Sequence, residues 1–526
     1  MKKSSLAVLI VGLALILGAT SLTFVQAQPI PGGRIIVGKP MDAVSLDSNS
    51  DTTAAGAIIY GNLIEPLLVM KDGKITPHLA TKYEIINPTR VRFSLRKGIQ
   101  FHDGTPFNAQ AVKFTLDRAV KMPARWLPLF GPLKGAEVVD EYTVDVLTEV
   151  PYGPILGAMT MIYAGIISPK AVETYGDDYG RHPVGTGPFK FKEWKTKESI
   201  TLVRNDNYWG KKAYLDEVVY KVIPEPGARM MGMRTGDLDM IIQPNPAELP
   251  AFRKDPKFTV AETQGQRIFS VVYNLTQPPV DDARVRHALA MAVNTKGILD
   301  NILEGGGVPA RSYIAPSIFG FQDMNLEKRY PYDPKKAKAL LAEAGWKPGS
   351  DGFLYKDGKK LSIRFLGAKN RFLMDAEICE AVQAMWKEIG VDVKLDFFEW
   401  AATFNQIRNP VNDYHVMHIG WVLPNPDADV YYYSLFHSSS MLPKGWNFCR
   451  FVNSEADKLL DEARSSYDQP KRLANYKRIQ EILAQQLPWV PIFNTKEMFV
   501  LKSTFKGFVP DPCEYLVPLD TVWVSK

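Results

Sequence analysis

The sequence predicts an α/β protein of two or more packed units, and three observations lead to that class. Apolar, β-branched segments that suit buried strands alternate along the chain with segments whose apolar residues recur at helical spacing. The chain has 526 residues, 46% of them hydrophobic, which is enough for a sizeable core. It contains no repeat, low-complexity tract or charged linker. Interleaved elements without linkers favour lobes joined by crossing strands over separate domains on a string.

The individual elements can be read from local patterns. Residues 34–38 are typical of a buried strand, residues 54–68 carry apolar side chains at helical spacing, and residues 90–96 alternate as a half-exposed strand does. Later helices are expected at residues 334–344, 375–388 and 454–466. We predict that the last of these begins at a capping box formed by Ser454 and Asp457.

The first 27 residues have the pattern of a cleaved export signal. Two lysines follow Met1, residues 6–17 form an almost unbroken apolar run, and Val25-Gln26-Ala27 offers small residues at the spacing that a signal peptidase reads. The run is shorter than the ~20 apolar residues that cross a bilayer, which favours cleavage over a membrane anchor. We therefore expect cleavage near Ala27, and a mature periplasmic protein that does not itself span a membrane.

Charge and cysteine content argue against several other classes. Without Lys2 and Lys3 the formal net charge falls from +6 to +4, and no basic block stands out, so nothing favours a nucleic-acid partner. Cys379, Cys449 and Cys513 lie too far apart for a CxxC redox pair or a zinc knuckle, and none is placed to carry a lipid near Ala27. We predict no metal and no other cofactor.

Residues 95–114, LRKGIQFHDGTPFNAQAVKF, form the most specific motif of the chain. The pattern predicts a strand, a tight turn at Asp103-Gly104 and a helix capped by Asn108. His102 and Asp103 have no nucleophile or second base nearby in the sequence, so we interpret them as turn-forming residues and not as a catalytic pair.

Further segments follow in a recognisable order. They are VGTGPFK at 184–190, RNDNYWG at 204–210, GDLD at 236–239, YN at 273–274, DARVRHAL at 282–289 and YDP at 332–334 leading to LLAEAGW at 340–346. Together with residues 95–114 they extend over nearly all of the mature chain. In this order they resemble bacterial extracellular solute-binding protein family 5, which serves oligopeptide, dipeptide, opine and nickel uptake.

The resemblance implies a two-lobed periplasmic-binding-protein fold, type II-like, with an extra subdomain inserted in the first lobe. By analogy, residues 28–65 and 181–272 form the first lobe, residues 66–180 the inserted subdomain and residues 273–488 the second lobe, and residues 489–526 return to the first. Two crossings between lobes make a hinge, and a ligand that touches both lobes favours the closed form. The implied partners are a small-molecule or peptide ligand and the permease and ATPase subunits of an ABC importer. We expect a monomer.

A secreted hydrolase is the rival class. The chain lacks a GxSxG elbow, an HExxH helix, a GxxxxGK[ST] loop and a GxGxxG after a strand. We therefore predict a binder and no catalytic residues, and a binder is distinguished from an enzyme because it returns its ligand unchanged.

Two histidines raise the question of a metal site. The segment 414–419, YHVMHI, is typical of a strand, in which His415 and His418 face opposite sides and cannot share one ion. Ordinary packing is favoured over chelation by this pair.

The resemblance also implies where the ligand binds, in a cleft lined by residues 399–404 and 419–427. Two tryptophans would give broad, rigid walls there, with core packing as the alternative, and the backbone at residues 420–422 could pair with an extended peptide as an added strand. The candidate ligand-binding residues are Trp400, Gly420, Trp421, Val422, Asp427, Asn447 and Arg371. Arg371 is included because dipeptide-binding members place a carboxylate-binding arginine near this point.

Pro424 departs from the family pattern. Members that grip free peptide N-termini carry an aspartate three residues after the tryptophan that corresponds to Trp421. Burying an unpaired ammonium is costly, so an ordinary dipeptide loses its anchor unless Asp427 or Asp429 replaces that aspartate. The leading ligand is peptide-like, with a modified peptide, an opine, an oligosaccharide or a nickel chelate as alternatives.

Overall fold

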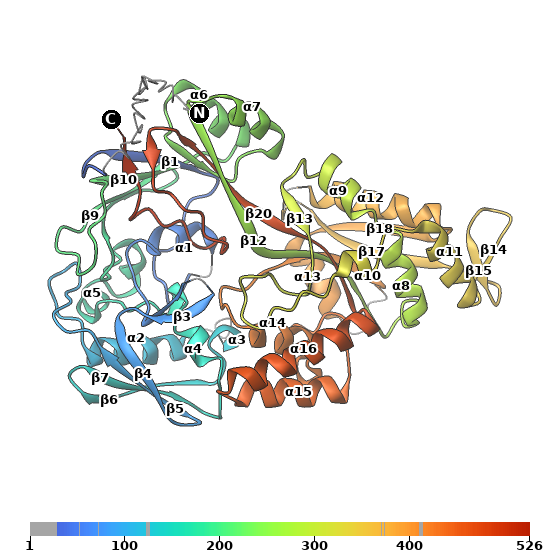
Figure 1. Ribbon diagram of the computed structural model, residues 1–526, viewed down its shortest axis with the longest axis horizontal. Coiled ribbons are helices and arrows are strands. Elements are labelled where there is room, and N and C mark those ends of the chain that lie inside the picture. Colours follow the sequence, from blue (N-terminus) through green and yellow to red (C-terminus); the bar gives the residue numbers. More distant parts are fainter. Residues whose placement is uncertain are drawn as a thin grey trace, which may run out of the picture.

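The computed structural model describes residues 29–51, 53–71, 73–122, 127–369, 371–372, 374–409 and 414–525. The predicted export signal therefore lies outside the described residues. Within them the fold is mixed α/β and consists of two lobes side by side (Figure 1). Of the helices in these ranges, none is both long and apolar enough to cross a membrane.

One large sheet runs through both lobes. Its strands, in spatial order, are β18 (Asp392–Glu399), β17 (Ser362–Lys369), β19 (Val416–Trp421), β12 (Phe258–Tyr273), β20 (Trp489–Lys502), β11 (Met240–Ile242), β1 (Arg34–Lys39), β10 (Glu217–Val222), β9 (Ser199–Arg204) and β8 (Phe189–Lys195), and β13 (Gly307–Pro309) pairs with β20. In the first lobe β1 is parallel to β10 and β11, and in the second lobe β17 is parallel to β18 and β19. The other pairs are antiparallel.

The long strands β12 and β20 connect the lobes, and they cross the middle of the molecule in Figure 1. Their register shifts between Gln264 and Ile268. On the far side of this shift β12 keeps β20 as one neighbour and gains β19 as the other, starting at Ile268 and Trp421. Residues 265–267 thus lie where β12 passes from pairing with β20 alone to pairing with both β20 and β19. A Cβ at Gly265 would lie 2.7 Å from Glu497 Oε1 and 3.0 Å from the backbone carbonyl of Thr495, so a larger residue there would have to displace the Glu497 side chain.

A separate antiparallel sheet lies within the range expected for the inserted subdomain. Its strand order is β4 (Ala80–Asn87), β5 (Arg90–Leu95), β7 (Thr143–Thr148) and β6 (Leu133–Asp140), and α2 (Ala109–Lys121) packs against β6 and β7. Asn108 caps α2, as the motif predicts, because its side chain accepts a hydrogen bond from Ala111 N at 3.2 Å.

The remaining elements surround these sheets. The other helices are α1 (Ala54–Tyr60), α3 (Leu127–Phe130), α4 (Ile155–Ala158), α5 (Pro169–Tyr175), α6 (Pro226–Thr235), α7 (Leu249–Lys254), α8 (Ala283–Met291), α9 (Thr295–Asn301), α10 (Leu326–Arg329), α11 (Pro334–Glu343), α12 (Asp375–Glu388), α13 (Trp400–Arg408), α14 (Ala428–Phe436), α15 (Ser454–Ser465) and α16 (Gln469–Gln486). Short strands form three small sheets, β2 (Leu68–Lys71) with β3 (Lys74–Pro77), β14 (Lys347–Pro348) with β15 (Leu354–Lys356) and β16 (Lys359–Lys360), and β21 (Phe505–Lys506) with β22 (Trp523–Val524).

The predicted helices 334–344 and 375–388 correspond to α11 and α12, but the start of α15 differs from the prediction. Asn453 is the N-cap, and its side chain accepts a hydrogen bond from Ala456 N at 2.9 Å. Asp457 instead accepts a hydrogen bond from Ser438 N at 3.0 Å. The predicted capping box of Ser454 and Asp457 is therefore wrong, because Ser454 already lies inside the helix and Asn453 takes the capping position.

Candidate ligand-binding site

The topology of the second lobe indicates where a ligand would bind. β17 and β19 pair only at Phe365↔Val416 and Leu366↔Met417. Beyond these pairs β17 continues alongside β18, whereas β19 continues alongside β12. The two parallel strands thus stop pairing toward their carboxyl ends, and ligands of open α/β sheets bind in a crevice outside the carboxyl ends of the strands. We call this candidate position the β17–β19 crevice.

Arg371 lies two positions after the last residue of β17, Lys369, at this candidate position. Its guanidinium carbon lies 3.2 Å from the centroid of the Trp400 ring and 4.9 Å from that of Phe372. Its Nη1 is buried without a hydrogen-bond partner, and within the described residues Arg371 makes no ion pair. Burial and the nearby charge of Arg267 lower the pKa of Arg371 to about 10, so it stays protonated at neutral pH. Arg371 therefore keeps one charged N–H donor, Nη1, that no described residue satisfies.

Aromatic rings extend from this guanidinium across the lobe. Trp400 is the first residue of α13 and lies 5.5 Å from Phe404 between ring centroids. Trp421 ends β19 and contacts Trp446 and Phe448 with centroid distances of 5.2 and 5.4 Å. Trp400 and Trp421 are half-buried, and the Trp421 indole nitrogen has no partner among the described residues. Both of the predicted tryptophans therefore keep part of their surface open.

Gly420 and Val422 flank Trp421 on the backbone. A side chain at Gly420 would meet the ring of Phe269 at 2.6 Å, so glycine is required there. The Gly420 carbonyl accepts a hydrogen bond from Arg267 Nη1 at 3.0 Å. Val422 is buried.

An ion pair that sequence reasoning missed borders the crevice from the hinge. Arg267 donates through Nε to Glu514 Oε2 at 2.9 Å, and Arg267 lies at the passage between lobes. Tyr515, the next residue, packs against Tyr163 of the first lobe with a centroid distance of 6.0 Å. The sequence offered one sign of this pair, because Arg267 is a charged residue immediately before the apolar run 268–273. Nothing in the sequence around Glu514 marked it as the partner.

Asp427 lies at the start of α14, where its carboxylate is bonded to protein groups. It caps α14 by accepting a hydrogen bond from Asp429 N at 3.0 Å, and Arg472 Nη2 donates to its carboxylate at 2.7 Å. Burial raises the pKa of Asp427. Asp429 is likewise buried and accepts two bonds from Arg464 at 2.9 and 3.0 Å. Both acids considered as replacement anchors already have arginine partners.

Asn447 holds the loop that carries Trp446. Its amide nitrogen donates to the carbonyls of His437 and Phe451 at 3.2 and 2.8 Å, and its Oδ1 accepts from Phe451 N at 3.0 Å. Because Asn447 is fully buried, its side chain positions the loop from inside the protein.

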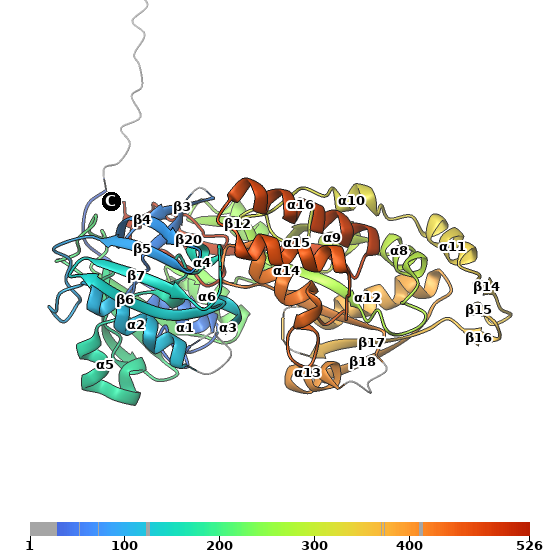
Figure 2. The same cartoon turned by 90° about the horizontal axis from the view of Figure 1, so that it is seen from below.

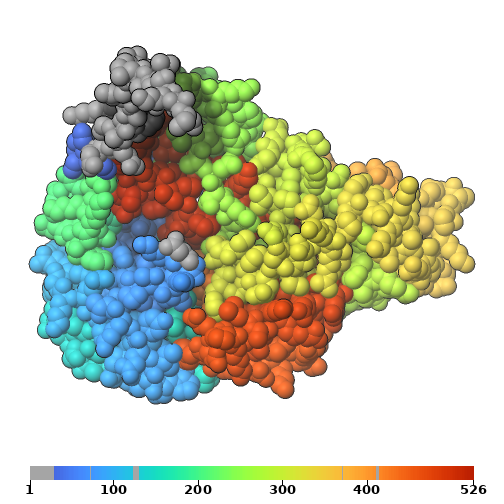
Figure 3. Space-filling model, viewed as in Figure 1, coloured from blue at the N-terminus to red at the C-terminus, as the bar shows by residue number. Residues whose placement is uncertain are grey.

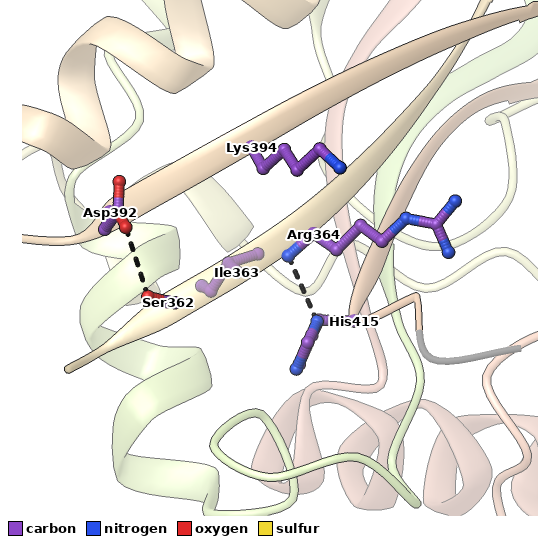
Figure 4. Close-up of a pocket in the computed structure, with 6 residues that line it drawn as sticks. All are labelled: Ser362, Ile363, Arg364, Asp392, Lys394 and His415. Carbon is purple, nitrogen blue, oxygen red and sulfur yellow. Dashed lines mark hydrogen bonds between the residues drawn. The ribbon is translucent and has the colours of Figure 1, made fainter. Parts of the chain in front are cut away.

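His415 and His418 lie in different surroundings. His418 is buried with Nδ1 3.6 Å from Asp375 Oδ1, and burial lowers the pKa of His418 to about 4 and raises that of Asp375 to about 7. His415 lines a hollow of about 350 Å³ at the amino ends of β17 and β18, where its Nδ1 accepts a hydrogen bond from Arg364 N (Figure 4). This hollow is at the opposite end of the strands from the β17–β19 crevice.

Comparison with known proteins assigns the family. The family model described as "Bacterial extracellular solute-binding proteins, family 5 Middle" matches residues 74–442. The chain belongs to this family. It is 30% identical to "Heme-binding protein A" of Haemophilus influenzae over 88% of this chain and 86% of that protein.

Solved structures share the fold. HbpA2 from Haemophilus parasuis superposes with a TM-score of 0.83 at 25% identity, over 94% of this chain and all of that one. The periplasmic binding protein DppA from Helicobacter pylori, in complex with the peptide STSA, gives a TM-score of 0.74 at 27% identity, over 94% and 99% of the two chains. This solute-binding protein therefore has the two-lobed binding-protein fold that the sequence predicts.

Proposed function

We propose that the protein is the periplasmic substrate-binding subunit of an ABC importer and that it captures a peptide-like solute bearing a carboxylate. The observation that carries this proposal is the buried Nη1 of Arg371, which has no hydrogen-bond partner among the described residues, on a guanidinium that lies just beyond β17 and stacks on Trp400. A guanidinium binds a carboxylate through two parallel hydrogen bonds, and a low-dielectric crevice strengthens them.

The proposed contacts use most of the residues expected from the sequence. Arg371 binds the ligand's carboxylate, while Trp400 and Trp421 enclose its apolar part. The backbone at Gly420 and Val422 borders the ligand, although the Gly420 carbonyl is already bonded to Arg267. Asp427 and Asn447 enter the proposal as supports of the binding loops, because their polar atoms are occupied by protein partners.

Delivery follows from the family. Solute-binding subunits hand their ligand to a membrane permease driven by an ATPase, and closure of the lobes over the ligand is the form that the permease recognises. We propose that this protein binds without catalysis, since the side chains around the crevice include a guanidinium and tryptophans but no nucleophile paired with a base among the described residues.

The test begins with the native ligand. Mass spectrometry of material that remains bound after native purification identifies its class, and an opine, an oligosaccharide or a nickel chelate would replace the peptide in the proposal. Calorimetric titration with di- to pentapeptides then compares wild type with Arg371→Gln and with Arg408→Gln. Arg408 is a matched control because its guanidinium also stacks on a ring of α13, Phe404, at 5.1 Å.

We expect Arg371→Gln to weaken peptide binding about 10- to 100-fold, as loss of a charge-assisted bond does, and Arg408→Gln to leave it unchanged. Equal binding by wild type and Arg371→Gln would contradict the carboxylate assignment while leaving the transport role intact.

A second ligand candidate is heme. The relative named for heme binding is 30% identical, and the half-buried rings of Trp400 and Trp421 suit a flat apolar ligand. Absorbance titration with heme tests this candidate, and peptide displacement of bound heme would place both ligands in one site.

Export is also part of the proposal. Protein secreted by a native host should begin at Gln28 on amino-terminal sequencing, and a mature protein that retains Met1 would contradict cleavage near Ala27.

A further inference from the structure

Two side chains of opposite sign, Arg371 and Asp375, follow β17 closely in the chain and do not pair. Arg371 Nη1 has no hydrogen-bond partner among the described residues, and neither has Oδ1 of Asp375, the first residue of α12. The chain between them turns back, because Asp375 Oδ2 accepts a hydrogen bond from Phe372 N at 3.0 Å. The Arg371 guanidinium lies against the ring of the same Phe372, 4.9 Å from its centroid. A donor and an acceptor that could form an ion pair thus remain unbonded on either side of one residue.

The free oxygen of Asp375 faces a histidine. His418 Nδ1, on β19, lies 3.6 Å from Asp375 Oδ1, and both side chains are almost fully buried. A carboxylate and an imidazolium would form a charge-assisted bond about 2.7–2.9 Å long. The longer separation fits an uncharged pair in which the Asp375 carboxyl carries the proton. Burial raises the pKa of Asp375 to about 7 and lowers that of His418 to about 4, which agrees with this assignment.

The other groups that act on the Asp375 carboxyl come from three elements. They are Arg267 of β12, Arg371 of the loop after β17, and Glu377 and Cys379 of α12 itself. The last two bring no positive charge. Arg267 is held by its bonds to Glu514 and to the Gly420 carbonyl. Of the described cations that act on Asp375, Arg371 is therefore the one with an unused donor.

We propose that Asp375 is a positioning residue for Arg371: its uncharged carboxyl leaves the guanidinium free for the ligand's carboxylate, and its ionised carboxylate draws the guanidinium away. The inference rests on the proposed function, in which Arg371 binds that carboxylate. A buried carboxylate without a cation is costly, and Arg371 has both the reach and the spare donor to relieve the cost. Asp375 and the ligand then compete for one guanidinium, so the protein with protonated Asp375 is the form that binds.

The test is calorimetric titration at pH 6, 7 and 8 with the peptide of the di- to pentapeptide library that wild type binds most tightly. Because the pKa of Asp375 is about 7, nearly all of the protein is competent at pH 6 and about a tenth of it at pH 8. Wild type should therefore bind about tenfold more weakly at pH 8 than at pH 6, relative to Asp375→Asn, which cannot ionise. The ratio of the two affinities removes any titration of the peptide itself.

Glu497→Gln is the matched control. Burial and the neighbouring Glu514 raise the pKa of the Glu497 carboxyl to about 8, so it titrates in the same range, but it lies on β20. This variant should keep the pH dependence of wild type. If Asp375→Asn does not fold, Asp375→Ser, which is smaller and also uncharged, takes its place in the same comparison.

An affinity ratio of wild type to Asp375→Asn that is the same at all three pH values would overturn the inference. A decline with pH that Glu497→Gln removes would overturn it as well, because the dependence would then belong to β20. Failure of the proposed function gives a different result. In that case no peptide binds at any pH, or Arg371→Gln binds as wild type does at pH 6, and the inference falls with the carboxylate assignment.

Discussion

Asp427 follows Trp421 by six residues, and its position alone suggested a replacement for the anchor that Pro424 cannot provide. Its carboxylate is nevertheless 2.7 Å from Arg472, and both side chains are almost fully buried. A buried ion pair that loses one partner leaves an uncompensated charge, which is strongly destabilising. Asp427 therefore contributes to the fold of the second lobe through Arg472.

We predict that Asp427→Asn lowers the free energy of unfolding by about 3 kcal/mol while ligand affinity changes less than about twofold. Chemical denaturation and calorimetry measure the two quantities. Asp357→Asn is a suitable control, since Asp357 is an exposed turn residue with a left-handed backbone that asparagine tolerates. A variant that keeps its stability but loses the ligand would show that Asp427 is an anchor after all.

Asp375 gives a pH-dependent prediction. Burial raises its pKa from 3.8 to about 7, so the folded protein binds this proton more tightly than the unfolded chain does. The contribution of Asp375 to stability is consequently present at low pH and is lost as the pH rises from about 4 to 7. His418, whose pKa is lowered to about 4, acts in the opposite direction between pH 4 and its ordinary value of 6.5.

Comparison of wild type with Asp375→Asn isolates the carboxyl, because His418 is present in both. Asparagine can still accept the hydrogen bond that Phe372 N donates at 3.0 Å. The variant should gain stability relative to wild type as the pH rises from 4 to 8, by at most about 4 kcal/mol. Urea denaturation at several pH values measures this difference, and a difference that does not change with pH would contradict the assignment.

At the scale of elements, the start of α15 offers a direct comparison of two candidate caps. Asn453 accepts the hydrogen bond from Ala456 N, so Asn453→Ala should cost about 1 kcal/mol of stability. Ser454→Ala should change the stability by less than about 0.5 kcal/mol, because Ser454 is already inside the helix. Thermal denaturation of both variants checks the order, and a larger loss for Ser454→Ala would restore the capping box.

Local patterns predicted most of the elements because their causes are local. The alternation at residues 90–96 and the turn and cap around Asn108 each depend on neighbours within a few residues. The register shift near Gly265 was not predictable, because it depends on how β12 pairs with β20 more than two hundred residues later. By analogy with the family, the second lobe is expected to start near Tyr273, which is the last residue of β12.

The candidate site was predictable only in part, because some of its contacts join residues that are distant in the chain. Trp421 and Arg371 were identified through resemblance and lie at the ends of adjacent strands. The partners of Asp427 and Arg267, which are Arg472 and Glu514, are distant in the chain, and nothing local indicates them. Long-range ion pairs thus decided which acids are available to a ligand.

At the scale of the whole molecule, the lobes are connected by the two strands β12 and β20, and residues 428–486 of the second lobe also share a buried cluster with the inserted subdomain, where orange and blue surfaces meet in Figure 3. Seen from below, α15 and α16 lie along the upper edge of the second lobe and α13 lies at its lower edge (Figure 2). Two connections between lobes make a hinge, and a ligand that contacts both lobes shifts the molecule toward the closed form by its differential affinity for the two states.

Hinge closure predicts a change of shape on binding. X-ray scattering should give a smaller radius of gyration for the protein saturated with its tightest-binding peptide than for the ligand-free protein, because the ligand favours the state in which both lobes contact it. Arg371→Gln should need a higher peptide concentration for the same compaction, and Arg408→Gln should behave as wild type does. Identical scattering profiles for the free and the saturated protein would mean that binding does not close the lobes.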